Sequence, residues 1–238
     1  MILLAIDTCD ARGSVAVLRD EAVLQVAIHD SGEEYSSWLL PAVKRVTEAA
    51  GVKVQEAQVY AAACGPGSFT GVRVGLTAVK AWGEVYARPI AAVSRLEAMA
   101  SQSTEDTRFV AAIVDAHRDQ VFAALYRRDG LRLQRIEDEV VITPGDFAQW
   151  VGSIVDGQPV AWVSPDMGRM TEQGAWAERV KAGDRAVNVE APFSGAIGKI
   201  GYRMALENRL TDALALDANY VRRTDAEVFW KGGAGHGR

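Results

Sequence analysis

The sequence predicts an α/β fold built from two lobes of similar design. Short apolar runs that indicate buried strands alternate with stretches that carry helix signals. A polar stretch without periodicity, residues 101–108, interrupts this pattern, and a new set of strands begins after it. The 238 residues suffice for two lobes of roughly 100 residues each. We therefore expect a first lobe over 1–104, a second lobe over 105–225 whose last helix can pack back on the first, and a flexible tail over 226–238.

The first lobe is expected to open with an antiparallel three-stranded meander and to continue with alternating helices and strands. The expected strands are 2–7, 14–18, 23–28, 59–64 and 90–93. The expected helices start at Ser36 or Ser37, at Ser68 or Thr70, and at Ser94, and they end near residues 50, 88 and 99. Serine and threonine favour helix N-caps because their side chains accept hydrogen bonds from free backbone amides. Gly51 fits the end of the first helix, and Pro41 is expected near its first turn.

The second lobe is expected to repeat the opening meander. Its strands are expected at 109–114, 121–126, 131–136 and 160–163, with Asp129-Gly130 as a turn signal before the third of them. Helical patterns cover 143–151 and 170–180, and a longer helix begins at Pro192 or Ser194 and ends near 208. The repetition lies in the order of the elements, since no short sequence repeat accompanies it.

The composition argues against several classes of protein. The formal net charge is −5, and basic pairs such as Arg127-Arg128 and Arg222-Arg223 are ordinary surface features. Unaided binding of RNA is therefore disfavoured, because neutralisation of phosphates dominates such affinity. The two cysteines provide no disulfide framework, and no apolar run approaches the roughly 20 residues of a membrane helix. We expect a cytoplasmic protein without membrane contact.

A glycine-rich turn between the strand 59–64 and the next helix is the first candidate site. Gly-Pro-Gly followed by a capping residue directs backbone amides and the positive end of a helix at one point, where an anion can bind. It is not a Walker loop, because the nearest lysine, Lys80, lies deep in the helix. The alternative interpretation is a plain strand-to-helix turn without a binding role. The expected anion or nucleotide corner consists of Asp7, Thr8, Gly65, Gly67, Ser68 and Thr70.

The helix 68–87 is the second candidate. Its polar residues Arg73, Thr77, Lys80 and Glu84 follow an i, i+4, i+7, i+11 course and leave an apolar arc wider than one sheet contact requires. One side should meet the protein's own sheet, and the other should meet either a neighbouring helix or another chain. With the helix before it, it is expected to form a partner-binding surface. The expected contact residues are Leu39, Val43, Val46, Val72, Arg73, Leu76, Val79, Lys80 and Trp82.

Several kinds of catalytic site are missing from the sequence. The three histidines, His29, His117 and His236, form no helical metal-binding pair. Gly65-Pro66-Gly67-Ser68 is followed by Phe69 where a nucleophile elbow needs its last glycine. We therefore expect no catalytic residue and no metal ligand in this chain.

The residues quoted next carry a resemblance to a known family. They are Ile2 to Thr8, Ser14 to Val17, Leu39-Leu40-Pro41, Gly65 to Leu76, Val93 to Ala98, Asp115 to Phe122 and Asn219 to Arg222. In this order they resemble the bacterial TsaB (YeaZ) family of threonylcarbamoyladenosine biosynthesis proteins, over nearly the whole chain and most densely over residues 1–126. The block Gly-Pro-Gly-Ser-Phe-Thr-Gly is long enough to be specific.

The resemblance implies a two-lobed actin/Hsp70/sugar-kinase-like (ASKHA) fold and a non-catalytic role. It implies a catalytic partner, TsaD, and an ATPase partner, TsaE, which carry the ATP and the magnesium or other metal. Together they would transfer threonylcarbamoyl from threonylcarbamoyl-AMP to N6 of the adenosine just 3′ of the anticodon, in tRNAs that read codons beginning with A. The chain would meet tRNA only through the complex and would form a homodimer when isolated. The family's former peptidase M22 label finds no support in these residues.

Two further expectations follow from this reading. Tyr35 stands where many relatives carry histidine, which changes the polar contact expected there. Leu76→Asp is expected to abolish the complex while the monomer stays folded, because a buried aliphatic contact is worth about 1.5–3 kcal/mol. The rival hypothesis is an ATP-binding enzyme acting alone through Asp7, the Gly65–Gly67 turn and Asp115.

Overall fold

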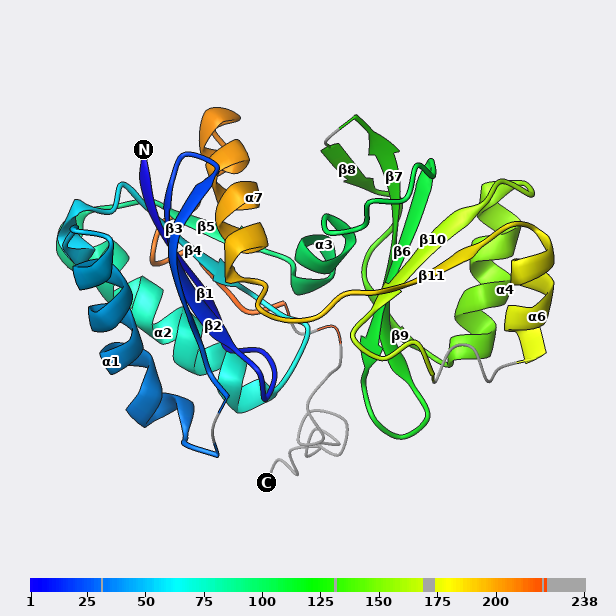
Figure 1. Ribbon diagram of the computed structural model, residues 1–238, viewed down its shortest axis with the longest axis horizontal. Helices are drawn as coiled ribbons and strands as arrows, with labels where there is room; N and C mark the ends of the chain where they lie inside the picture. The colour runs from blue at the N-terminus through cyan, green and yellow to red at the C-terminus, as the bar shows by residue number, and fades with distance from the viewer. Residues whose placement is uncertain (31, 131, 169–173, 220, 222–238) are drawn as a thin grey trace, which may run out of the picture.

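The computed structural model describes residues 1–30, 32–130, 132–168, 174–219 and 221. Figure 1 shows two lobes side by side, each with one twisted sheet and its own helices. The expected tail over 226–238 and the pair Arg222-Arg223 lie outside the described residues. Among the described residues, no helix combines the length and the apolar content needed to span a bilayer.

The first sheet has the strand order β3-β2-β1-β4-β5. Its strands are β1 (Ile2–Asp7), β2 (Ser14–Arg19), β3 (Ala22–Ile28), β4 (Val59–Ala63) and β5 (Ile90–Val93). β1, β2 and β3 pair antiparallel in sequence order, so the predicted meander is confirmed. β4 and β5 add in parallel, which places the end of β1 beside the end of β4.

The second sheet repeats this plan with the order β11-β10-β6-β7-β8, and β9 also pairs with β7. Its strands are β6 (Phe109–Asp115), β7 (Val121–Asp129), β8 (Arg132–Arg135), β9 (Val140–Ile142), β10 (Val160–Ser164) and β11 (Arg185–Asn188). The sequence did not predict β9 or β11. Both are short and contain no buried residue: β9 is a run of three apolar residues, too short to indicate a strand by itself, and β11 has no apolar pattern.

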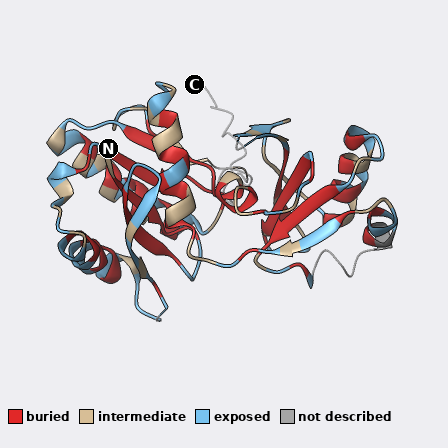
Figure 2. Ribbon diagram, turned by 45° about the horizontal axis from the view of Figure 1, so that its top comes forward, coloured by how far each residue is buried: buried red, intermediate tan, exposed pale blue. Residues whose placement is uncertain are grey.

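The helices cover both faces of each sheet. They are α1 (Tyr35–Ala49), α2 (Phe69–Tyr86), α3 (Arg95–Ala100), α4 (Pro144–Val155), α6 (Gly174–Lys181) and α7 (Ser194–Leu206), with a 3₁₀ turn at Val54–Glu56. α1 and α2 lie on one face of the first sheet and α7 on the other. α3 lies between the lobes, where it contacts β6, β7, β10 and α7. The residues packed between the helices and the sheets are buried (Figure 2).

The start of α1 differs from its prediction. The helix begins at Tyr35, and the N-cap residue Glu34 makes no side-chain cap, so neither Ser36 nor Ser37 acts as one. Pro41 consequently lies inside the helix on its exposed side, where only the carbonyl of Ser37 loses its helical partner. By contrast, the predicted cap of α2 is confirmed, since the amide of Gly71 donates to Oγ of Ser68.

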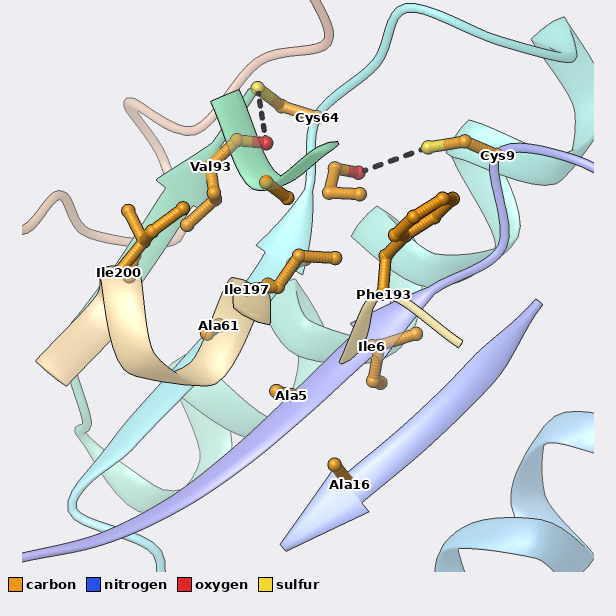
Figure 3. Packing of buried hydrophobic residues seen from close by; sticks show 14 of the residues in the cluster. Ala5, Ile6, Cys9, Ala16, Ala61, Cys64, Val93, Phe193, Ile197 and Ile200 are labelled. Atoms are coloured by element: carbon orange, nitrogen blue, oxygen red, sulfur yellow. Dashed lines mark hydrogen bonds between the residues drawn. The ribbon is translucent and has the colours of Figure 1, made fainter. Parts of the chain in front are cut away.

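α7 belongs to the first lobe by its contacts, although it follows the second lobe in sequence. Figure 3 shows Phe193, Ile197 and Ile200 above the small residues of the first sheet. Gly198 lies so close to Leu18 that a β-carbon there would collide with it. The lobe expected over 105–225 therefore ends with β11, and its last helix packs back on the first sheet, as the sequence allowed.

Candidate functional site

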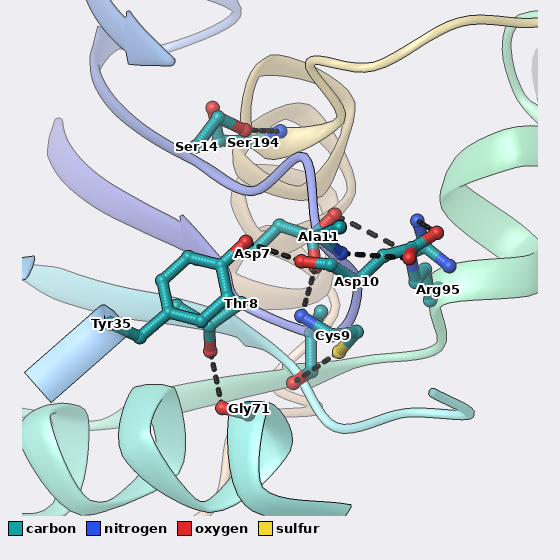
Figure 4. Close-up of polar contacts among 11 residues, drawn as sticks. Asp7, Thr8, Cys9, Asp10, Ala11, Ser14, Tyr35, Gly71, Arg95 and Ser194 are labelled. Carbon is teal, nitrogen blue, oxygen red and sulfur yellow. Dashed lines mark hydrogen bonds and ion pairs between the residues drawn. The ribbon is translucent and has the colours of Figure 1, made fainter. Parts of the chain in front are cut away.

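The turn at Gly65–Gly67 lies where β1, β4 and the start of α2 meet. β1 ends at Asp7 and its partner β4 ends at Ala63, because the two strands run in parallel register. The loop after β1 consequently crosses directly over the first turn of α2 (Figure 4). The structure thus brings Asp7 and Thr8 to the glycine turn, as the sequence predicted.

One of the backbone amides at the predicted anion corner, that of Ser68, is already used by the chain. The amide of Ser68 donates to the carbonyl of Cys9 at 2.7 Å. The hydroxyl of Thr8 donates to the carbonyl of Gly71 at 2.6 Å, one turn further along the helix. A β-carbon at Gly67 or at Gly71 would collide with the carbonyl of Cys9 or of Thr8. The glycines therefore serve close packing of the loop on the helix.

The other side of the turn is covered by the C-terminal segment. Gly65 has φ +112°, a conformation that favours glycine, and a β-carbon there would lie 3.0 Å from the carbonyl oxygen of Asn219. The amide of Asn219 donates to the carbonyl of Cys64 at 2.7 Å, and the amide of Arg95 donates to that of Gly65 at 2.8 Å. Of the six predicted corner residues, only Ser68 and Thr70 are exposed.

A buried arginine occupies the space beside the strand-end carboxylate. Nε of Arg95 lies 3.5 Å from Oδ2 of Asp7, and these two side chains are 2% and 0% exposed. The same guanidinium lies 3.0 Å from Oδ2 of Asp10 and 5.2 Å from the ring centre of Phe193. The other oxygen of Asp7 accepts a hydrogen bond from the amide of Cys9 at 2.9 Å. Asp7 is therefore neutralised by a side chain of its own chain.

The electrostatics of this cluster favour a fixed positive charge and neutral thiols. Burial lowers the pKa of Arg95, but Asp7, Cys9 and Asp10 outweigh it, and the net pKa lies above the usual value. Burial, followed by the charge of Asp7, raises the pKa of the Cys9 thiol well above its usual value. Burial raises the pKa of Cys64 to about 12. Neither cysteine is thus suited to act as a nucleophile.

The sequence did not reveal Arg95, Asp10 and Tyr35 as members of this cluster. The hydroxyl of Tyr35 donates to the carbonyl of Asp10, and its ring lies 4.3 Å from that of His29. Burial, with the charge of Asp7 next, raises the pKa of Tyr35 above its usual range. The one available signal for Arg95 was a charge between two apolar segments, directly after a capping serine.

The apolar residues predicted to bind a partner face the protein's own sheet. Each is at most 5% exposed, so the expectation that they supply exposed contact area is wrong for this chain; they are Leu39, Val43, Val46, Val72, Leu76 and Val79. They pack in the layer between α1, α2 and the first sheet. Arg73 is exposed, with its guanidinium 3.6 Å from the ring centre of Phe69. Lys80 and Trp82 are half-buried.

α2 also has a second apolar side, which we call the outer face of α2. Its members are Thr70, Val74, Thr77, Ala78, Ala81 and Val85, which lie on one side of the helix at 100° per residue. All are exposed or half-buried, and Val85 is 72% exposed. Arg73, Lys80 and Glu84 form one border of this face. The outer face is therefore uncharged and mostly apolar, with two threonines among its small side chains, and it is accessible.

The region between the lobes contains a small acidic cavity of about 130 Å³. Asp10 contributes from the first lobe and Asp115, Ser164 and Asp166 from the second. His117 lies 3.2 Å from Asp115 and is 87% exposed. The described residues contain no group of three or more side chains suited to hold a metal ion. Both ring nitrogens of His29 lie within 2.9 Å of backbone carbonyls, so that side chain is not available as a ligand.

Two α/β lobes that each open with an antiparallel meander, with α3 between them, are typical of the actin/Hsp70/sugar-kinase class of fold. A solved relative in that class is the ROK hexokinase from Thermus thermophilus, which matches with a TM-score of 0.53 at 11% identity over 87% of this chain and 100% of that one. This likeness concerns the fold alone.

The sequence comparisons are more specific. Residues 28–197 match a family model described as TsaD, tRNA N6-adenosine threonylcarbamoyltransferase. TsaB of Bacillus subtilis is 28% identical over 97% of this chain and 98% of its own, and TsaB of Escherichia coli is 33% identical over 60% and 63%. YeaZ of Pseudomonas aeruginosa matches with a TM-score of 0.76 at 23% identity, over 92% of this chain and 99% of that one. The chain belongs to this family and, within it, to the TsaB (YeaZ) group.

Proposed function

We propose that this chain is a required, non-catalytic subunit of the machinery that makes threonylcarbamoyladenosine in tRNA. Relatives that match over most of the chain are named tRNA threonylcarbamoyladenosine biosynthesis proteins, which supports the pathway. The reaction transfers threonylcarbamoyl from threonylcarbamoyl-AMP to N6 of the adenosine just 3′ of the anticodon, in tRNAs that read codons beginning with A. It takes place with tRNA in the cytoplasm.

The observation that carries the non-catalytic role is the buried contact of Arg95 with Asp7. In nucleotide-binding members of this fold class, a carboxylate at this strand end is suited to hold a metal-bound water. Here a guanidinium takes up its charge, and the amide of Ser68 donates to Cys9 instead of to a phosphate. The amide of Ser68 would have to leave the carbonyl of Cys9 before it could contact a phosphate. These contacts support a role in which the chain's own residues position helices and the chemistry is left to the partners.

The proposed partner surface is the outer face of α2 together with the exposed side of α1. Small side chains allow two helices to approach closely, and an accessible apolar face gains free energy when a partner covers it. Arg73, Lys80 and Glu84 along its border would set the orientation of the partner. The surface fits a similar helix pair on a TsaD-like subunit or, in the isolated protein, on a second copy.

The chemistry is assigned to the partners. A TsaD-like subunit would catalyse the transfer and a TsaE-like ATPase would work with it; ATP and magnesium or another metal belong on those subunits. The chain would meet tRNA only through the complex, in keeping with its net charge of −5.

Reconstitution of the modification tests this role. The assay mixture contains both partners, ATP, threonylcarbamoyl-AMP and tRNA. The modified nucleoside should form in it only when this chain is present. Ala81→Glu places a charge on the outer face of α2 and should prevent rescue, whereas Gln149→Glu on the exposed side of α4 should rescue fully. Modification at the full rate without the chain would contradict the proposal.

A further inference from the structure

The C-terminal end of α2 forms one wall of an open groove on the first lobe. The segment that follows α7 forms another wall, and it is held to β5 by paired backbone hydrogen bonds between Thr211 and Ile90. Gly83 lets α2 approach β5 closely here, because a β-carbon at that position would lie 2.8 Å from Cδ1 of Ile90. The groove has a volume of about 540 Å³, enough for a long side chain. Its lining residues include Glu84, Arg88, Asp212 and Ala213.

Two large apolar side chains directly follow lining residues of this groove. Val85 follows Glu84 on α2 and is 72% exposed, and Leu214 follows Ala213 and is 89% exposed. They are the two most exposed large hydrophobic side chains in the part of the chain that the structure describes. Val85 belongs to the outer face of α2, and Glu84 both borders that face and lines the groove. A partner that covers the outer face of α2 would therefore reach the groove as well.

The charges at the groove favour a cationic occupant. The side chain of Glu84 is exposed and makes no hydrogen bond or ion pair with another described residue. Asp212 is also exposed, and its Oδ1 accepts hydrogen bonds from the amides of Leu214 and Ala215 at 2.9 and 2.7 Å. The C-terminal end of α2 adds partial negative charge. Arg88 is the one cation among the described lining residues, so negative charge prevails.

We propose that the TsaD-like subunit inserts an arginine or lysine side chain into this groove, with its cationic group at Glu84 and its methylene groups near Val85 and Leu214. Long cationic side chains suit such a place, because their carbon chains cover apolar surface while the charge stays in a polar environment. The proposal rests on the proposed function and extends the partner surface from α2 to the segment after α7. A charged contact at one end of α2 also fixes the direction in which the partner lies along the helix.

Neutral substitutions at the two opposite charges test the sign of the occupant. Binding of the whole chain to an immobilised TsaD-like subunit is measured for Glu84→Gln and for Arg88→Gln. Glu84→Gln should weaken binding about fivefold or more, because the inserted cation loses its carboxylate. Arg88→Gln should leave the affinity unchanged or raise it, because it removes a like charge. Loss of binding at Arg88 alone would indicate an acidic occupant and would overturn the proposal.

Filling the groove is the second measurement. Ala213→Arg places the chain's own guanidinium in the groove and should weaken binding at least about tenfold. Ala215→Arg is the control: it lies in the same turn but outside the lining residues, and it should bind within about twofold of wild type. Thermal unfolding shows whether both variants are folded.

The two proposals fail in different ways. If the wild type binds and Ala81→Glu blocks binding, but Glu84→Gln and Ala213→Arg bind normally, the groove proposal is overturned and the proposed function stands. A wild-type chain that does not bind the TsaD-like subunit overturns both.

Discussion

Nε of Arg95 lies 3.5 Å from Oδ2 of Asp7, and neither atom has a hydrogen-bond partner among the described residues. The contact is therefore an ion pair without the two parallel hydrogen bonds of a bidentate pair. It joins the start of α3, the helix between the lobes, to the end of β1. The backbone amide of Arg95 donates to the carbonyl of Gly65, so this residue contacts both the end of β1 and the glycine turn.

Arg95→Ala should destabilise the chain by about 3–5 kcal/mol, because it leaves the buried carboxylate of Asp7 without a counter-charge. Asp7→Asn in the same chain should restore part of this loss. Urea unfolding measures both. Arg12→Ala is the matched control, since that arginine lies 3.8 Å from Glu190 in an exposed pair; its effect should stay below about 1 kcal/mol. An equal effect at both arginines would contradict the assigned role.

Gly71→Ala should lower the free energy of unfolding by about 1–3 kcal/mol, because the new β-carbon would collide with the carbonyl of Thr8. Gly145→Ala is the control: that glycine lies in the first turn of α4, and no atom approaches its β-carbon position within 4 Å. Thermal unfolding of the two variants should separate them clearly. A Gly71→Ala chain as stable as the wild type would show that the loop is not packed on α2 as described.

Ala81→Glu should reduce binding to a TsaD-like subunit at least about tenfold, because the interface would bury an unpaired charge. The isolated chain should keep its stability, since residue 81 is exposed. Leu76→Asp should behave differently from the sequence expectation: Leu76 is 5% exposed, and the variant should lose more than about 3 kcal/mol of stability. Unfolding curves and immobilised-partner binding together distinguish the two. Normal co-purification of the Ala81→Glu chain would exclude this face.

Glu139 links the lobes and should make stability depend on pH. It accepts hydrogen bonds from Ser94 and from Asn219, the latter at 2.7 Å. Burial raises its pKa above 4.5, although Ser94, Arg135 and Asn219 act in the opposite direction. The charged form is therefore disfavoured on folding, so its contribution to stability is complete below pH 4.5 and is lost as pH rises through the raised value.

Glu139→Gln removes this titration. Relative to wild type, the variant should therefore gain stability as the pH is raised from about 4.5 towards neutrality. Urea unfolding across that range measures the difference, with Glu48→Gln on the exposed side of α1 as the reference for the amide substitution. A stability difference between wild type and Glu139→Gln that is constant with pH would contradict the assigned protonation.

The opening meander of each lobe and most helices were predictable because their signals are local. Buried strands such as β4 are short apolar runs, and the cap of α2 is the serine that follows the glycine turn. β11 lacked such a signal because an edge strand of four residues with no buried member has no apolar pattern. The start of α1 was missed because Glu34 caps it without a side-chain hydrogen bond.

The site was only partly predictable because its decisive contacts are remote in sequence. Periodicity showed correctly that α2 is apolar on more than one side. It could not decide which side meets the sheet, so Val72, Leu76 and Val79 were assigned to the partner although they face the core. The ion pair of Asp7 with Arg95 joins two elements that are far apart in the chain, so no local sequence pattern predicts it.

The central claim is that the glycine turn of this chain is closed by its own atoms and serves no nucleotide. Calorimetric titration of the isolated chain with ATP and magnesium, combined with an assay for released phosphate, tests it most directly. The account predicts only the heat of dilution and no phosphate release, because the amide of Ser68 and the carboxylate of Asp7 are already engaged. Micromolar binding of ATP accompanied by turnover would contradict it and would favour an enzyme that acts alone.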